Sequence, residues 1–184
     1  MSDLFKNEPA LLKVALLGNP VLRKKVENVT REELKDPRTA YFIDSMIDTM
    51  REYNGAGLAS PQVHVSKKII IIEAQDNPRY PKRGEIPLTV LVNPEIVSFS
   101  QEVEEGWEGC LSVAGLWGRV KRSTAITVNA MTREGKDVEI KAEGFFAVVL
   151  QHEIDHLYGK LFVDRMEDMS TLCFTQEYNR YWSD

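Results

Sequence analysis

The feature that most constrains the fold is the stretch from Phe145 to Gly159, FFAVVLQHEIDHLYG. Its apolar residues gather on one side at helical spacing, and Gly159 supplies a common helix ending. A helix this apolar has to be buried. The sequence therefore predicts one late, central helix around which the rest of the chain packs.

The polar part of this helix is His152-Glu153-Ile154-Asp155-His156. Residues four apart lie on one face of a helix, so the two imidazoles can bind one metal ion. Glu153 lies on nearly the same face as His156 and can reach a water on that ion without being a ligand. The chain has only 3 histidines, and two of them fall in this motif. This argues for a metal site and against a chance match in a core helix.

The residues leave two candidates for the third ligand. Phe162 stands where a metzincin has its third histidine, and it cannot bind a metal. Glu177 lies at about the downstream position of a thermolysin-type carboxylate. Cys110 lies in E-G-C-L-S, where neighbouring glycines let the backbone approach a metal closely. A thiolate with two imidazoles leaves the fourth position open for catalysis, which favours Cys110. Cys173 is expected to be a small buried residue.

The rest of the chain is predicted to be mainly strands, so we expect an α+β fold. A turn at Gly18-Asn19-Pro20 lies within an early segment that is predicted to be helical. Apolar spacing predicts a helix from Asp36 to Asn54. The predicted strands are Lys67–Glu73, Leu88–Asn93, Ile96–Val103, and a hairpin of Thr124–Met131 with Val138–Phe145. Asp76–Pro87 is predicted to be a loop, and Leu172–Trp182 is ambiguous between strand and helix.

Composition sets the class of protein. The 184 residues carry 23 basic and 28 acidic side chains, and we expect a single catalytic domain spanning residues 1–184. A pI near 5.4 argues against a protein held to nucleic acid or anionic lipid by bulk charge. We also expect no sequence-specific nucleic-acid partner. Apolar runs are too short for a membrane span, and the first residues do not resemble a signal peptide. The 2 cysteines favour a reducing compartment, so we expect a cytoplasmic protein.

Three motifs taken in order are far more specific than any one of them. They are G-A-G-L-A-S-P-Q from Gly55, E-G-C-L-S from Glu108 and Q-H-E-I-D-H-L from Gln151. Together they resemble the peptide deformylases. The resemblance implies a fold of mixed and antiparallel strands around a central metal-binding helix. It also implies an enzyme that removes the formyl group from the N-formylmethionine of nascent polypeptides and releases formate.

The resemblance also implies a role for each matching residue. Cys110, His152 and His156 are expected to be the metal ligands, and Glu153 the general base. The side-chain amide of Gln62 and the backbone N–H of Leu111 are expected to form the oxyanion hole. The backbone of Gly57 is expected to pair with the substrate. The methionine pocket is expected to be lined by Ala56, Val148 and Val149. Asp155 is left open between a partner of an imidazole or of Arg122 and a surface charge.

The family commonly uses ferrous iron, so Fe²⁺ is the expected metal, and Zn²⁺, Ni²⁺ or Co²⁺ can occupy the same ligands. Expected partners are N-formylmethionyl nascent peptides and, near them, the ribosome. The chain departs from the common bacterial pattern at Ser60, Ala114 and Trp117. The S-V-A-G form is similar to the organellar type, which leaves an organellar origin open. Trp117 replaces an arginine near the substrate and is a candidate for lining the groove beyond methionine.

Two rival functions share parts of this pattern. The first is a metallopeptidase that uses Glu177 as third ligand, and metal analysis of Cys110 and Glu177 variants separates it from a deformylase. The second is a metal-stabilised binding domain near the ribosome without enzymatic activity. In that case Glu153→Ala would be silent.

Overall fold

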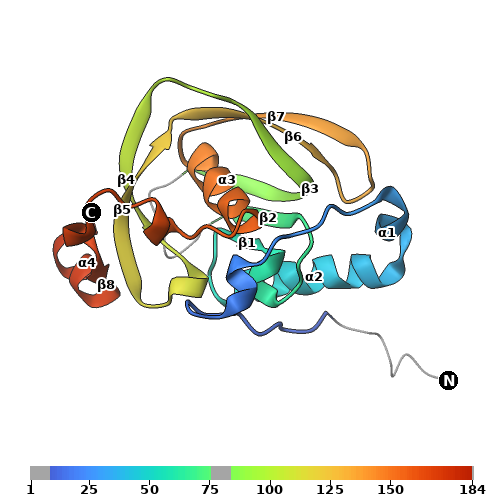
Figure 1. Ribbon diagram of the computed structural model, residues 1–184, viewed down its shortest axis with the longest axis horizontal. Coiled ribbons are helices and arrows are strands. Elements are labelled where there is room, and N and C mark those ends of the chain that lie inside the picture. Colours follow the sequence, from blue (N-terminus) through green and yellow to red (C-terminus); the bar gives the residue numbers. More distant parts are fainter. Residues whose placement is uncertain (1–8, 76–83, 184) are drawn as a thin grey trace.

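The computed structural model describes residues 9–75 and 84–183, which form two antiparallel sheets around one central helix (Figure 1). That helix is α3, Gly144–Leu157, and it confirms the helix predicted from the apolar stretch. It ends just before Gly159, whose φ of +67° suits a glycine. Among the described residues, no helix is both long and apolar enough to span a membrane.

The larger sheet has five strands in the order β1-β2-β3-β6-β7. Their bounds are Gly57–Ala59, Ile69–Ala74, Ile86–Phe99, Ala125–Met131 and Asp137–Glu143. The predicted hairpin is confirmed, with Ala125 opposite Glu143 and Met131 opposite Asp137. β1 is an edge strand that pairs only with β2 among the named strands, so one of its sides is open to other partners.

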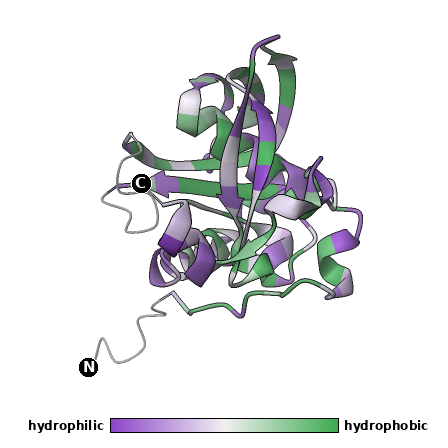
Figure 2. Cartoon of the chain, turned by 90° about the vertical axis from the view of Figure 1, so that its left-hand side faces the viewer, coloured by the Kyte–Doolittle hydropathy of each residue, from purple (hydrophilic) through white to green (hydrophobic). Residues whose placement is uncertain are grey.

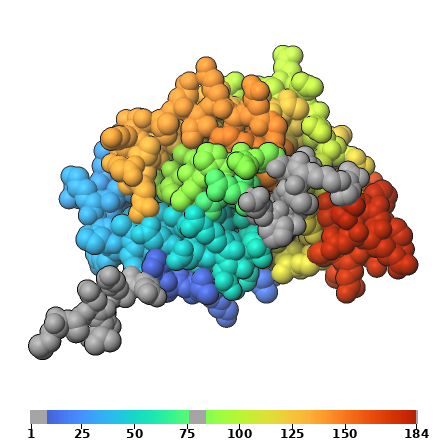
Figure 3. All heavy atoms as spheres, turned by 180° about the vertical axis from the view of Figure 1, so that it is seen from behind, coloured from blue at the N-terminus to red at the C-terminus, as the bar shows by residue number. Residues whose placement is uncertain are grey.

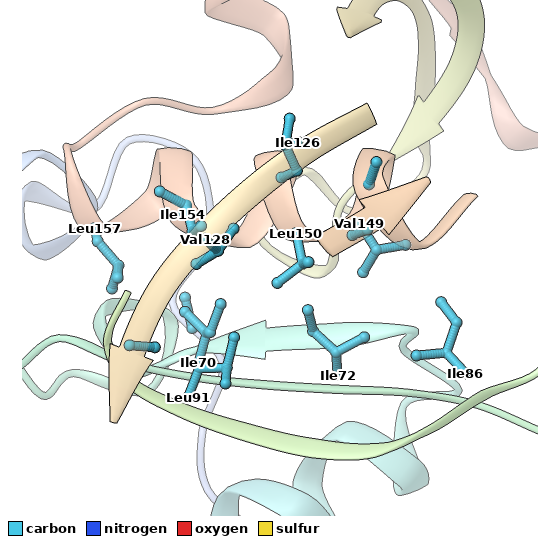
Figure 4. Close-up of a cluster of buried hydrophobic side chains, with 14 of the residues drawn as sticks. Ile70, Ile72, Ile86, Leu91, Ile126, Val128, Val149, Leu150, Ile154 and Leu157 are labelled. Atoms are coloured by element: carbon cyan, nitrogen blue, oxygen red, sulfur yellow. The ribbon is translucent and has the colours of Figure 1, made fainter. Parts of the chain in front are cut away.

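Helices cover both faces of this sheet, because alternate residues of β2 point to opposite sides. On one face α3 contributes Val149, Leu150, Ile154 and Leu157, which face Ile70, Ile72 and Leu91 (Figure 4). On the other face α2, Pro37–Glu52, packs Ile43, Met46, Ile47 and Met50 against Ile69 and Ile71. Asp36 caps α2 by accepting a hydrogen bond from the Arg38 N–H at 2.9 Å. The predicted helix therefore exists, within two residues of its predicted end.

The smaller sheet has three strands in the order β4-β5-β8, with bounds Val103–Gly109, Leu116–Ser123 and Cys173–Phe174. A loop with the short 3-10 helix Leu111–Val113 joins β4 to β5. Helix α4, Thr175–Tyr181, follows β8, so the ambiguous tail contains both a strand and a helix. The C-terminal residues (red) form one end of the molecule (Figure 3).

Two predictions about secondary structure are wrong, and strand β5 was not predicted. The two strands predicted on either side of Pro94 are one strand, β3, because an irregularity near Asn93 (φ +51°) absorbs the proline. The early segment is not helical: residues 9–16 lack regular structure, and only Pro20–Arg23 forms a 3-10 helix. β5 was not predicted, because the buried charge of Arg122 disturbs its apolar pattern. Most of the predicted loop Asp76–Pro87 lies outside the described residues.

Candidate active site

A buried thiol and two buried imidazoles meet at the centre of the fold. Cys110 directly follows β4, and His152 and His156 lie one turn apart on α3. Their ligand atoms all lie within 4.8 Å of one another, and Cys110 Sγ is 3.4 Å from His156 Nε2. A tetrahedral ion with ordinary metal–sulfur and metal–nitrogen bonds separates such atoms by about 3.5 Å. These three residues therefore fit a divalent metal ion, whereas Glu177 is exposed on α4.

Glu108 is a residue of this site whose role the sequence reasoning missed. It lies at the end of β4, and its Oε2 is 2.8 Å from His152 Nδ1. This contact assigns the proton to Nδ1 and leaves Nε2 for a metal. Burial alone would raise the pKa of Glu108, but the hydrogen bond from His152 and the charge of Arg122 lower it to about 2. A carboxylate two residues before a cysteine ligand, on the same face of a strand, was the available signal.

Arg122 extends this contact into a buried network. Its guanidinium donates to Glu108 at 2.7 and 3.0 Å and to Asp155 at 2.6 Å. Arg165 also donates to Asp155, at 2.5 and 3.0 Å. Asp155 is thus a buried partner of Arg122 and not a surface charge. The network joins β4, β5 and the metal-binding helix, and so fixes the orientation of His152.

Glu153 lies beside the triad and presents a carboxylate to the same space. The side chain is buried, and its Oε2 has no hydrogen-bond partner among the described residues. Burial raises the pKa of this carboxyl to about 7. Gly57 makes room for it, since a Cβ at position 57 would lie 2.5 Å from Glu153 Oε1. Glu153 is therefore a buried carboxylate next to the metal ligands, and its Oε2 can accept a proton.

Gln62 is held in a fixed orientation on the other side of the triad. Its Oε1 accepts a hydrogen bond from the Ala59 N–H at 2.8 Å. Its Nε2 donates to Ser112 Oγ at 3.2 Å and lies 3.5 Å from Cys110 Sγ. Leu111 is the first residue of a 3-10 helix, where a backbone N–H has no partner within the helix. Two N–H donors can therefore face the same space as Glu153.

A pocket opens onto these groups. It is lined by Gly55, Ala56, Gly57, Gln62, Trp107, Glu108, Gly109, Cys110, Leu111, Phe145, Val148, Val149, His152 and Glu153. All the residues to which the resemblance gives a role line this pocket except His156, which belongs to the triad. Phe145 and Trp107 are additional wall residues that the sequence reasoning did not assign.

Trp117, the candidate for lining the groove, is not among the residues that line this pocket. Its side chain is only 4% exposed, and its ring stacks on Tyr178 at 4.3 Å between centroids. Trp107 occupies the pocket wall instead. Trp107 and Trp117 lie on neighbouring strands, and Tyr178 of α4 packs against both rings. The inward position of Trp117 follows from the pleat of β5, which the sequence pattern did not reveal.

Comparison with known proteins decides the family. The family model for polypeptide deformylase matches residues 11–171. The chain belongs to the polypeptide deformylase family. Peptide deformylase 2 of Nostoc sp. is 44% identical over 170 residues, covering 92% of this chain and 94% of that protein. The peptide deformylase of Leptospira biflexa is 38% identical over 169 residues, covering 91% of this chain and 94% of that protein.

Solved deformylases share the fold as well as the sequence. The class I type b peptide deformylase of Acinetobacter baumannii with Met-Ala-Ser bound has a TM-score of 0.83 at 43% identity, covering 86% of this chain and 99% of that one. The Thermotoga maritima deformylase has a TM-score of 0.76 at 35% identity, with the same coverage of 86% and 99%. As a deformylase, this protein is a metal-dependent hydrolase that removes the N-formyl group from nascent polypeptides. Both rival functions are therefore set aside.

Proposed function

We propose that Cys110, His152 and His156 hold ferrous iron and that Glu153, Gln62 and Leu111 carry out deformylation around it. One observation carries this proposal. The three ligand atoms lie within 4.8 Å of one another, and the unpartnered carboxylate oxygen of Glu153 belongs to the wall of the same pocket. When bound, a divalent cation supplies Lewis-acid chemistry, polarising a carbonyl oxygen and easing the ionisation of water.

Glu153 is proposed as the group that moves the proton. Its Oε2 takes a proton from the attacking water and then delivers it to the nitrogen of the leaving amine, which would otherwise depart as a poor leaving group. Because the carboxylate is buried and has no competing donor on Oε2, it is free to hold that proton. Gly57 has no side chain, so it leaves the space that the Glu153 carboxylate occupies.

Gln62 and Leu111 are proposed to stabilise the charge that develops on the formyl oxygen. The amide of Gln62 cannot rotate freely, since its oxygen is bound by the Ala59 N–H and its nitrogen by Ser112 Oγ. Its second N–H, which donates to Cys110 Sγ at 3.5 Å in this structure, and the backbone N–H of Leu111 are then oriented before the substrate arrives. Removing one preorganised donor of this kind typically lowers kcat by about a hundredfold to a thousandfold.

The remaining wall residues are proposed to position the substrate. Ala56, Val148 and Val149, together with Phe145, provide an apolar surface for the methionine side chain. The backbone of Gly57 lies on the open side of the edge strand β1, where an extended peptide can add as another strand. In this proposal the formyl group lies between Glu153 and Gln62.

Formate release from formyl-Met-Ala-Ser tests these roles. The protein is purified without oxygen and loaded with Fe²⁺ or Ni²⁺. We expect Glu153→Gln to retain metal while losing nearly all activity, and Cys110→Ser to lose both. Cys173→Ser and Glu177→Gln are matched controls that should retain both. Full activity in Glu153→Gln, or full metal content in Cys110→Ser, would contradict the assignment.

The choice of ferrous iron has its own test. A thiolate beside ferrous iron is open to oxidation, while the affinity order of divalent metals does not itself favour iron. We expect the Fe²⁺ form to lose activity in air and the Ni²⁺ form to keep it. An iron form that is indifferent to oxygen would contradict this part of the proposal.

We also propose that the enzyme works in the cytoplasm close to the ribosome, because its substrates are the formylated ends of nascent chains. Co-sedimentation with ribosomes tests this proposal, with an irrelevant protein of similar charge as the control.

A further inference from the structure

The segment of residues 10–23, here called the N-terminal segment, contacts α2, the two loops that carry Gln62 and Ser112, and the residues that follow α3. It is mostly apolar and runs along one side of the molecule (Figure 2). Figure 3 shows its residues (blue) directly against those of α2 (cyan). There the backbone N–H of Ala10 donates to Ser45 Oγ at 3.1 Å and that of Leu12 to Thr49 Oγ1 at 2.8 Å. Both hydroxyl residues are fully buried.

Two further hydrogen bonds of this segment reach the proposed oxyanion hole. The Ala15 N–H donates to the carbonyl oxygen of Gln62 at 2.7 Å, and the Leu17 N–H donates to that of Ser112 at 2.7 Å. Gln62 and Ser112 are the pair already linked through Gln62 Nε2 and Ser112 Oγ. The N-terminal segment therefore binds the backbone of both Gln62 and Ser112, the two residues whose side chains are hydrogen-bonded to each other.

The far end of the segment contacts the end of the metal-binding helix. The Arg23 guanidinium donates to the Gly159 carbonyl at 2.7 Å and pairs with Asp164. The Arg23 backbone also packs against Gly159, since a Cβ added to Gly159 would lie 3.4 Å from it. The segment is anchored between these contacts by a small buried cluster of Ala15, Val21 and Leu22.

We infer that Ala15 and Leu17 are positioning residues for the oxyanion hole, acting through the carbonyl groups of Gln62 and Ser112. This inference rests on the proposed role of Gln62. Hydrogen bonds to the two carbonyls set the distance between the loop of Gln62 and the loop of Ser112. That distance determines whether Gln62 Nε2 can reach Ser112 Oγ and stay aimed at the formyl oxygen. A small displacement of such a donor lowers the rate of the chemical step more than it weakens substrate binding.

Leu17 offers a clean way to remove one of these bonds. Leu16 to Asn19 form a turn, with the Asn19 N–H bonded to the Leu16 carbonyl at 2.9 Å and Gly18 at φ +97°. A positive φ at the third position identifies a type II turn, whose second position accepts proline readily. Leu17→Pro should therefore keep the fold and remove only the N–H. Leu17 is half exposed, so Leu17→Ala is the matched control that keeps the N–H.

The experiment measures kcat and KM for formyl-Met-Ala-Ser with metal-loaded Leu17→Pro, Leu17→Ala and Ala15→Pro. We expect about a tenfold loss of kcat in Leu17→Pro with KM and metal content nearly unchanged, and no loss in Leu17→Ala. Ala15→Pro removes the other bond and should act in the same direction. Equal kcat in the proline and alanine variants of Leu17, with both folded, would overturn the inference.

A double-mutant cycle separates positioning from general destabilisation. In a Gln62→Ala background the oxyanion amide is absent, so Leu17→Pro should lower kcat by less than about twofold. An undiminished loss in that background would show that the N-terminal segment acts elsewhere and would overturn the inference. Gln62→Ala alone tests the proposed function: if it keeps full kcat, the role of Gln62 fails, independently of the result at Leu17.

Discussion

At the scale of single residues, Gly57 tests how tightly the site is built around Glu153. A Cβ at this position would lie 2.5 Å from Glu153 Oε1 and 2.7 Å from its carboxyl carbon. Gly57→Ala should therefore push the carboxylate aside and lower kcat by about a hundredfold, while the metal ligands keep their ion. Gly106→Ala is the control, because an added Cβ there meets nothing within 4 Å. Kinetics and metal analysis of both variants check this, and normal kcat in Gly57→Ala would contradict it.

Glu108 tests the residues behind the metal ligands. It accepts hydrogen bonds from both His152 and Arg122 and is buried. Glu108→Gln should lower metal affinity by about tenfold to a hundredfold, because the imidazole loses the carboxylate that orients it. Glu105→Gln on the same strand is the control, since Glu105 pairs with Arg119 at the surface. Competition with a chelator measures the affinity, and equal values for the two variants would refute this role.

At the scale of elements, helix α4 supports the wall of the pocket. Trp107 lies in that wall, and the rings of Tyr178 and Trp182 pack against it at 5.3 and 5.7 Å between centroids. Trp107→Ala should change the relative kcat/KM for formyl-Met-X-X peptides by about tenfold between small and aromatic X. Tyr178→Ala should shift the same preference less, as it acts through Trp107. A preference profile unchanged in Trp107→Ala would exclude this side chain from recognition.

The elements also show why parts of the fold could be predicted and others not. Helices α2 and α3 and the β6–β7 hairpin follow from local periodicity, and the three motifs identify the ligands. β5 was not predicted because the charged side chain of Arg122 points inward. Its burial is stabilised by ion pairs with Glu108 and Asp155, which lie far away in the sequence. The N-terminal segment resembles helix in composition, yet its N–H groups bind α2 and two remote loops. In each case the deciding partner lies far away in the sequence.

At the scale of the whole molecule, the metal site joins the two sheets. Cys110 follows a strand of the smaller sheet, and His152 and His156 lie on the helix that packs on the larger one. A ligand that binds only the folded state stabilises it, by about 2.7 kcal/mol at a hundredfold excess over Kd. The metal-loaded protein should therefore unfold at a higher temperature than the metal-free protein, and the difference should grow with metal concentration.

Cysteine variants show whether this stabilisation arises from the link between the sheets. Cys110→Ser removes the only ligand that the smaller sheet contributes to the described triad, so its Tm should respond weakly to added metal. Cys173→Ser alters a thiol in the same sheet outside the triad, and its Tm should rise with metal as in the unaltered protein. Thermal unfolding of the three proteins across a metal titration measures this. An equal rise of Tm in Cys110→Ser would mean that the residues of α3 hold the ion without Cys110. In that case packing and the Arg122 network, and not the metal ion, would join the two sheets.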